Sequence, residues 1–308
     1  MSVAAPPAAP PTPSPARWYA HSYNRPSYYR LALATAPRLP RRARRWLAAG
    51  AARVLAPCLA VERAAVGRNL ARVHPGRDGA WLDAAVRRVF QRFAVCFADL
   101  LSLNREPAAK LWQHVARVEC DQPARELLTR ERGSVFVTAH LGNWQLAGRL
   151  LATFGRRVHL VMAPEQEPGV AAILDGDPDS GLRAVRRTSP LVSVELVAAL
   201  RRGEFVAFQM DRAMGDRGDR RVPFFGAAAA FPLGPFVMAG AAGVPVVPAF
   251  CVLDEGGRYR LCVEAAFDVR RGEEERGLAR AVTVLERYVT GYWEQWFNFF
   301  DVWSSERP

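Results

Sequence analysis

One histidine of this sequence lies where a predicted strand gives way to a predicted helix, a position suited to catalysis. Residues 134–139 form a short apolar run with β-branched side chains, which predicts a buried strand. Asn143 is a favourable N-cap for a helix that begins at Trp144 and ends at Gly155. His140 therefore follows the strand at its carboxyl end, where open α/β sheets bind their ligands.

Backbone N–H groups next to this histidine complement it chemically. We expect those of Gly142, Asn143 and Trp144, at the start of the helix, to lack helical acceptors and to attract negative charge. A base beside such donors suits acyl transfer, because the base removes a proton while the donors stabilise an oxyanion. The alternative is that His140 only donates a hydrogen bond to a buried carbonyl group.

Polar side chains also follow the predicted strand 204–210. Asp211 and Arg212 come directly after it, so they too lie at the carboxyl end of a strand. From these residues alone, a local ion pair at a solvated strand end is the simpler interpretation. A further basic patch combines Arg183, Arg186 and Arg187, and it is either a solvated surface or a docking site for a phosphorylated headgroup or acidic carrier.

The elements that must position these residues alternate between strands and helices, which predicts an α/β fold. We expect a mixed, mostly parallel sheet flanked by helices. The predicted strands are 115–120, 134–139, 157–163, 204–210, 244–253 and 259–264, and the predicted helices are 62–104, 121–130, 144–155, 191–202 and 273–297. An apolar stripe within residues 86–100 recurs at helical spacing and indicates a core-facing helix.

The N-terminal part of the chain has a different composition. Residues 1–16 are rich in Pro and Ala and predict a disordered tail, not a signal peptide. Residues 17–61 combine aromatic and Arg side chains with an apolar run shorter than the roughly 20 residues that a spanning helix needs. We expect this segment to be helical and to lie on a membrane surface, and residues 62–308 to form the main domain. A packing helix with a solvated charged face is the alternative.

Composition narrows the classes of partner. The chain has 308 residues, and 42 basic against 30 acidic side chains give a formal net charge of +12. This charge favours an acidic membrane surface, an acidic carrier protein or nucleic acid, but no nucleic-acid recognition motif accompanies it. The five Cys residues lack the C-x-x-C spacing, so we expect a reduced, cytoplasmic protein without a metal site.

The segment T-A-H-L-G-N-W-Q, residues 138–145, resembles the H-x-x-x-x-[DE] motif of the lipid A biosynthesis acyltransferase family, the bacterial lauroyl and myristoyl transferases. Other segments resemble that family in the same order, over residues 29–303. They include an R-x-x-x-x-N-L-x-x-V-like segment at 68–73, a D-x-x-x-G-like segment from Asp211, V-P-F-F-G at 222–226 and E-Q-W at 294–296. The shared order and spacing make the resemblance specific.

The resemblance implies an acyltransferase of the EC 2.3.1 type. It would move a fatty acyl group from acyl-carrier protein or acyl-CoA to a glycolipid or lysolipid acceptor, in lipid A-type envelope lipid biosynthesis. It would act at the cytoplasmic face of the inner membrane, held peripherally, with no cofactor besides the acyl co-substrate. The implied catalytic residues are His140, Gln145 and Asp211, and the implied substrate-binding residues are Gly142, Asn143, Arg187, Arg212, Phe224, Phe225 and Gly226.

The sequence departs from the family pattern at two places. Gln145 occupies the position of the motif carboxylate, and F-N-F-F-D-V-W at 297–303 replaces a basic H-R-R cluster. Gln145 can accept the ring N–H of His140 without adding charge, or another carboxylate supplies the charge: Asp211 first, then Glu165 or Glu167. The third alternative is a non-catalytic relative that binds lipid or partner proteins.

Overall fold

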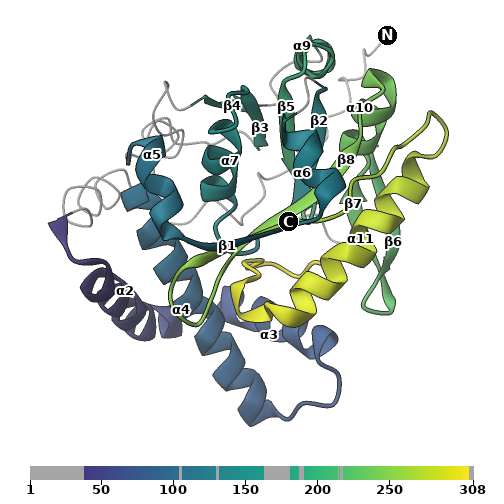
Figure 1. The fold of residues 1–308 in the computed structure, drawn as a ribbon. Coiled ribbons are helices and arrows are strands. Elements are labelled where there is room, and N and C mark those ends of the chain that lie inside the picture. Colours follow the sequence, from purple (N-terminus) through teal and green to yellow (C-terminus); the bar gives the residue numbers. More distant parts are fainter. Residues whose placement is uncertain are drawn as a thin grey trace, which may run out of the picture.

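The computed structural model describes residues 38–103, 106–129, 132–162, 181–186, 191–213, 215 and 218–304. The expectations for residues 1–37, Glu165, Glu167 and Arg187 fall outside these ranges. The described elements form one seven-stranded sheet with helices on both faces, together with a separate two-stranded hairpin (Figure 1).

The main sheet is mixed and mostly parallel, as the sequence predicts. Its strand order is β1-β9-β8-β2-β5-β3-β4. Only β8 and β9 pair antiparallel within it, as a hairpin, and every other neighbouring pair of these described strands is parallel. The strands are β1 (Val115–Cys120), β2 (Ser134–Thr138), β3 (Val158–Met162), β4 (Leu182–Arg186), β5 (Phe205–Gln209), β8 (Val246–Leu253) and β9 (Tyr259–Val263).

The helices cover the two faces as two separate cores. Val135 and Val137 of the central strand β2 pack into one core, whereas Phe136 packs into the other, as the period of a strand requires. The first core includes α9 (Leu191–Arg201), α10 (Gly234–Ala242) and α11 (Glu274–Gly291). The second includes α3 (Ala60–Val73), α4 (Gly79–Leu103), α5 (Ala108–Leu111), α6 (Gln122–Thr129) and α7 (Trp144–Ala152).

A small hairpin lies beside the first core. It pairs β6 (Asp219–Phe224) with β7 (Ala227–Pro232) in antiparallel register. Its turn places Phe225 at φ 47° and Gly226 at φ 76°, and a bulky residue in the left-handed region is strained. The N–H of Phe225 donates to the carboxylate of Glu286 in α11, which holds this turn against that helix.

Two predicted helices are wrong in extent. The predicted helix 62–104 is two helices, because α3 ends at Val73 and Pro75 follows, before Gly76 at φ 86°. The predicted closing helix 273–297 ends at Gly291, and the 3₁₀ turn η5 (Trp293–Gln295) follows. The chain then becomes extended, because it pairs with the loop that carries His140.

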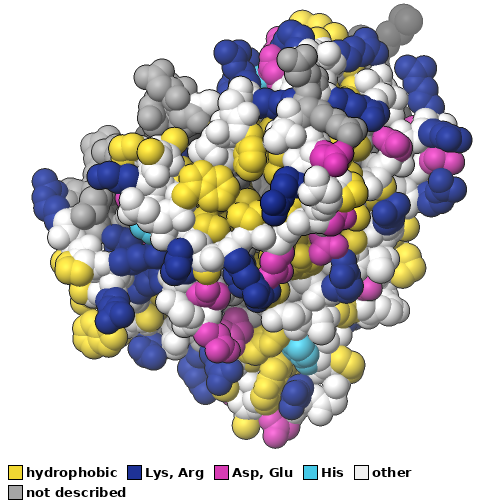
Figure 2. All heavy atoms as spheres, viewed as in Figure 1, with side chains coloured by type: hydrophobic (Ala, Val, Ile, Leu, Met, Phe, Trp, Pro, Cys, Tyr) yellow, Lys and Arg dark blue, Asp and Glu magenta, His cyan; other side chains and the backbone are white. Residues whose placement is uncertain are grey.

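The basic N-terminal segment forms α2 (Arg41–Leu55), which packs against α4 and continues through the 3₁₀ turn η2 (Ala56–Cys58). No described helix is long and apolar enough to cross a membrane. Several large apolar side chains of α2 and α3 nevertheless face solvent, with exposed fractions of 73% for Trp46, 73% for Val54 and 77% for Val61. Figure 2 shows basic and hydrophobic side chains intermixed in the region where α2 lies.

Candidate active site

The ends of the neighbouring strands β2 and β5 bring His140 and Asp211 together. The two strands are parallel and in register, so the residues that follow them meet at the same edge of the sheet. Nδ1 of His140 lies 2.8 Å from Oδ1 of Asp211, and the backbone N–H of His140 lies 3.0 Å from both carboxylate oxygens. The sequence predicted both positions, and the structure shows that they form a pair.

Asp211 is held by donors that come from outside its own strand. Its Oδ2 accepts hydrogen bonds from the indole Nε1 of Trp296 at 3.0 Å and from Nδ2 of Asn298 at 2.8 Å. Burial alone would raise the pKa of Asp211. The charge and ring hydrogen bond of His140 and the charge of Arg212 outweigh burial, and hold this pKa well below its usual range. Asp211 is therefore ionised at neutral pH.

An ionised carboxylate only accepts hydrogen bonds, so Nδ1 of His140 carries the hydrogen. The second ring nitrogen, Nε2, is then the unprotonated one, and no partner binds it among the described residues. Burial first, and then the charge of Arg212, lower the pKa of His140, while Asp211 opposes both effects. The ring is neutral at pH 7 and 17% of the side chain is exposed, so Nε2 is available as a base.

The expectation that the N–H groups of Gly142 and Asn143 stabilise an oxyanion is wrong. The N–H of Gly142 donates to Gln295 O at 2.9 Å, and that of Asn143 to Cys251 O at 2.8 Å. These bonds tie the loop to η5 and to β8. A side chain at position 142 would clash with the backbone, since a Cβ there would lie 2.1 Å from Cys251 O, and its φ is 66°. The role of Gly142 is this close approach.

Asn143 is the N-cap of α7, as predicted. Its Oδ1 accepts a hydrogen bond from the N–H of Leu146 at 3.0 Å. Gln145 is buried in the first turn of the same helix. Within the described part of the chain, the ring of His140 bonds to Asp211 and not to Gln145, so the alternative in which Gln145 accepts the ring N–H is wrong. The first of the alternative carboxylates supplies the charge that Gln145 lacks.

The other residues that were predicted to contact substrate mostly contact other residues inside the protein. Arg212 donates from Nε to Oδ1 of Asn298 at 2.9 Å and from Nη2 to Phe297 O at 2.8 Å, and burial lowers its pKa to about 10. Phe224 is fully buried and stacks on Trp303, which explains its apolar character without a substrate. Of the turn residues Phe225 and Gly226, Phe225 is half-buried and Gly226 is exposed.

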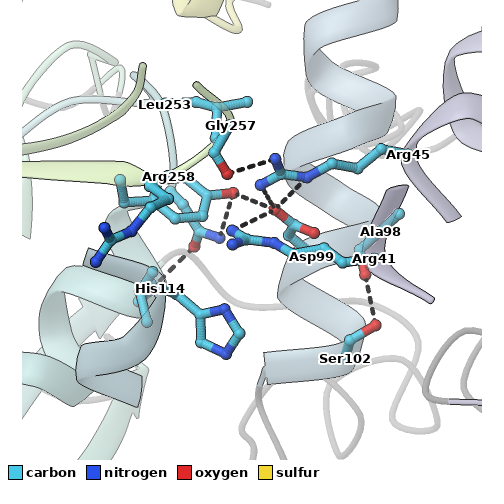
Figure 3. A network of polar contacts seen from close by, with 12 residues as sticks. Arg41, Arg45, Ala98, Asp99, Ser102, His114, Leu253, Gly257 and Arg258 are labelled. Carbon is cyan, nitrogen blue, oxygen red and sulfur yellow. Dashed lines mark hydrogen bonds and ion pairs between the residues drawn. The ribbon is translucent and has the colours of Figure 1, made fainter. Parts of the chain in front are cut away.

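A second buried polar network connects α2 to the cap of α7. Asp99 of α4 is fully buried and forms ion pairs with Arg41, Arg44 and Arg45, of which Arg41 and Arg45 appear in Figure 3. The hydroxyl of Tyr259 donates to Oδ2 of Asp99 at 2.9 Å and accepts from Nδ2 of Asn143 at 3.3 Å.

This network also keeps its carboxylate ionised. Burial would raise the pKa of Asp99, but the hydrogen bond and charge of Arg45, the charge of Arg41 and the hydrogen bond from Tyr259 lower it overall. Ion pairs and hydrogen bonds through Asp99, Tyr259 and Asn143 thus connect α2 at the surface to α7 beside the active site.

These features define an α/β domain with a neutral histidine base and an ionised carboxylate at adjoining strand ends. The family model for bacterial lipid A biosynthesis acyltransferases matches residues 20–305, so the chain belongs to that family and is an acyltransferase of the EC 2.3.1 type. No curated protein matches the chain. A solved structure of the 1-acyl-sn-glycerophosphate (LPA) acyltransferase PlsC from Thermotoga maritima is similar over 80% of this chain and 98% of that one, at 18% identity and a TM-score of 0.34. The family match carries the assignment.

Proposed function

We propose that the chain transfers a fatty acyl group from a thioester donor to a hydroxyl or amine of a glycolipid or lysolipid, in lipid A-type envelope lipid biosynthesis. The observation that carries this proposal is the hydrogen bond of 2.8 Å between Nδ1 of His140 and the ionised Asp211. It leaves Nε2 of a neutral ring available to remove a proton. The non-catalytic alternative arose from the missing charge at Gln145, and Asp211 supplies that charge.

In the proposed reaction, Nε2 of His140 takes the proton of the acceptor hydroxyl while the hydroxyl oxygen attacks the thioester carbonyl carbon. The imidazolium that forms is stabilised by Asp211. The tetrahedral intermediate then collapses, the C–S bond breaks, and the thiolate leaving group takes the proton back from Nε2. An ester and a free thiol result, without an acyl-enzyme.

The oxyanion needs donors other than Gly142 and Asn143. We assign this role to the N–H groups of Trp144 and Gln145, the first two of α7, for which the described residues provide no acceptor. A donor of this kind contributes about 3 kcal/mol in a dry site.

The donor is an acyl-carrier protein or acyl-CoA, and a net charge of +12 supports an acidic carrier.

We further propose that α2 and the start of α3 rest on the cytoplasmic face of the inner membrane. The exposed Trp46, Val54 and Val61, next to the exposed Arg42 and Arg53 of α2, support binding to anionic lipid. Co-sedimentation with anionic vesicles that falls as salt rises is the expected result. Equal binding to neutral vesicles at all salt concentrations would contradict it.

Replacement of His140 tests the function. We expect His140→Ala to lower the rate of acyl transfer from a radiolabelled acyl thioester by about 10²- to 10⁴-fold. The matched control is His159→Ala, because His159 is another buried histidine bound to a carboxylate, that of Glu204, and it lies near the amino end of β3, away from the carboxyl ends of the strands. It should cost stability and leave the rate per folded molecule unchanged.

In the wild type, kcat/KM should fall as pH drops through the pKa of His140, because a base must be unprotonated. Since burial lowers that pKa, activity should persist to a lower pH than an ordinary histidine, with a pKa of about 6.5, would allow. Normal transfer by His140→Ala would disprove the mechanism.

A further inference from the structure

The last described stretch of the chain crosses the active site. Residues 296–303, which we term the C-terminal strap, follow η5 and run beside the loop that carries His140. The N–H of Phe297 donates to His140 O at 2.7 Å, and Trp296 forms a β-bridge with Leu141. The strap therefore holds the backbone of the catalytic loop from the side opposite β8, which Gly142 contacts.

The side chain of Asn69 in α3 binds the backbone of the strap. Its Nδ2 donates to Asn298 O at 3.1 Å and to Phe300 O at 2.8 Å, and its Oδ1 accepts from the N–H of Val302 at 3.2 Å. Asn69 is 2% exposed, so these bonds are shielded from competing water. The strap is thus a defined element and not a loose end.

The β6–β7 hairpin fixes the aromatic side chains of the strap. Indole Nε1 of Trp303 donates to Phe224 O at 3.0 Å, and the rings of these two residues stack with centroids 5.3 Å apart. The ring of Phe224 also meets Trp296 edge-on at 5.8 Å. Trp296 thus packs against the hairpin with its indole N–H directed to Asp211.

Two side chains of the strap end on the carboxylate of Asp211. Trp296 and Asn298 are 3% and 1% exposed, and both donate to Oδ2. The amide of Asn298 has a fixed orientation, because its Oδ1 accepts from Nε of Arg212. With Oδ2 occupied by these donors, Oδ1 of Asp211 remains for Nδ1 of His140.

We propose that Trp296 and Asn298 are positioning residues, which orient the Asp211 carboxylate so that it fixes the tautomer and direction of the His140 ring. This inference rests on the proposed function of His140 as the base. It assigns a role in the reaction to the segment where the chain departs from the family's basic ending. A base displaced by about 1 Å loses on the order of 10²-fold in rate, so loss of either donor should act on kcat.

The strap contains its own matched control. Trp296→Phe removes an indole N–H that binds Asp211, whereas Trp303→Phe removes one that binds the backbone carbonyl of Phe224. Both changes keep a ring in the same aromatic cluster. We expect Trp296→Phe to lower kcat by about 10- to 100-fold with little change in KM, and Trp303→Phe to change neither.

A second variant and a second readout make the test independent of stability and of turnover. Asn298→Asp is nearly isosteric, but it places a carboxylate 2.8 Å from Oδ2 of Asp211 in place of a donor. Two carboxylates at this distance cannot both be ionised and share one proton, so part of the negative charge moves from Asp211 to the new carboxylate, away from His140. The pKa of His140 should therefore fall, and the acid limb of the pH–rate profile should move to lower pH. In ¹⁵N-histidine-labelled protein, the Nδ1–H signal of His140 should shift in Trp296→Phe and Asn298→Asp, and stay unchanged in Trp303→Phe.

The outcomes separate this inference from the proposed function. If wild type transfers acyl groups and His140→Ala does not, yet Trp296→Phe and Trp303→Phe match in kcat, pH profile and Nδ1–H signal, the positioning role is wrong and the function stands. If His140→Ala retains the rate, the function fails. The Nδ1–H signals then decide the positioning of the ring, and unchanged signals in Trp296→Phe and Asn298→Asp overturn it.

Discussion

Two carboxylates are buried in the part of the chain that the structure describes, and their charges are compensated in different ways. Asp99 is surrounded by three arginines of α2 and a tyrosine hydroxyl. Asp211 instead accepts from an indole, a side-chain amide, and the ring and backbone of His140. Both carboxyl pKa values are lowered, so charge state alone does not distinguish the two sites.

The difference lies in what each environment leaves for chemistry. Three arginines form ion pairs with Asp99 and fix α2 to α4, which is a structural arrangement. The hydrogen-bond donors around Asp211 are neutral and fix its direction, and although the charge of Arg212 helps to lower the pKa of Asp211, the carboxylate still raises the pKa of His140. A carboxylate that must stabilise an imidazolium needs the second environment.

Replacing each aspartate by asparagine should therefore affect different properties of the protein. The larger effect is the loss of catalytic rate in Asp211→Asn. Asp211→Asn removes the charge that stabilises the imidazolium, and its amide can donate to Nδ1 and impose the wrong tautomer. In a serine-protease triad the corresponding change costs about 10⁴ in kcat, and we expect a loss of that order. The acid limb should also move to lower pH, because Asp211 raises the pKa of His140. Turnover and pH–rate profiles of the purified variant measure both.

Asp99→Asn should instead act on stability. Removing one partner of a buried ion pair leaves uncompensated charge, and we expect a loss of about 3–5 kcal/mol in the free energy of unfolding. The wild-type contribution has a defined pH window: it is present above the unfolded carboxyl pKa of about 3.9 and is lost as pH falls through the lower folded value. Urea unfolding at several pH values measures this. If Asp99→Asn were as stable as the wild type but lost about 10⁴-fold in rate, Asp99 would be the carboxylate that serves catalysis, and the comparison would be wrong.

The catalytic pair could be located from the sequence because strand ends are local features. The apolar runs before His140 and Asp211 predict strands, and parallel strands place the residues after them at one edge of the sheet. Asn143 could likewise be identified as a helix cap, since capping depends on residues three positions apart.

The roles of Trp296 and Asn298 could not be found from the sequence, and the donors Gly142 and Asn143 were misassigned, because all four depend on contacts with distant parts of the chain. The aromatic ending resembles a continuation of the helix before it, and nothing local shows that it crosses the loop of His140. The N–H of Gly142 donates to Gln295 O, and that of Asn143 donates to a carbonyl of β8. Trp296 and Asn298 donate to Asp211, 85 and 87 positions away. The E-Q-W segment marked Trp296 as part of the family pattern, but only the preference of an indole N–H for a buried acceptor pointed to its role as a donor.

The smallest expected effect comes from Gln145→Glu, which restores the carboxylate of the family motif. If Gln145 were the partner of His140, the added charge would raise both the pKa of His140 and the rate. Because Asp211 already occupies Nδ1 at 2.8 Å, the new carboxylate finds no ring N–H to accept. Gln145 is 4% exposed, so the variant should either protonate the new group or lose about 1–3 kcal/mol of stability.

We therefore expect the rate of Gln145→Glu to stay within about threefold of wild type, well below the loss at Asp211. Gln145→Met provides the matched control, because it keeps the volume of the side chain and removes its polar groups. Turnover of both variants on one acyl donor, normalised to the folded fraction from thermal unfolding, decides the point. A marked rise in the rate of Gln145→Glu, with Gln145→Met unchanged, would show that the Asp211 carboxylate does not by itself supply the charge the base needs.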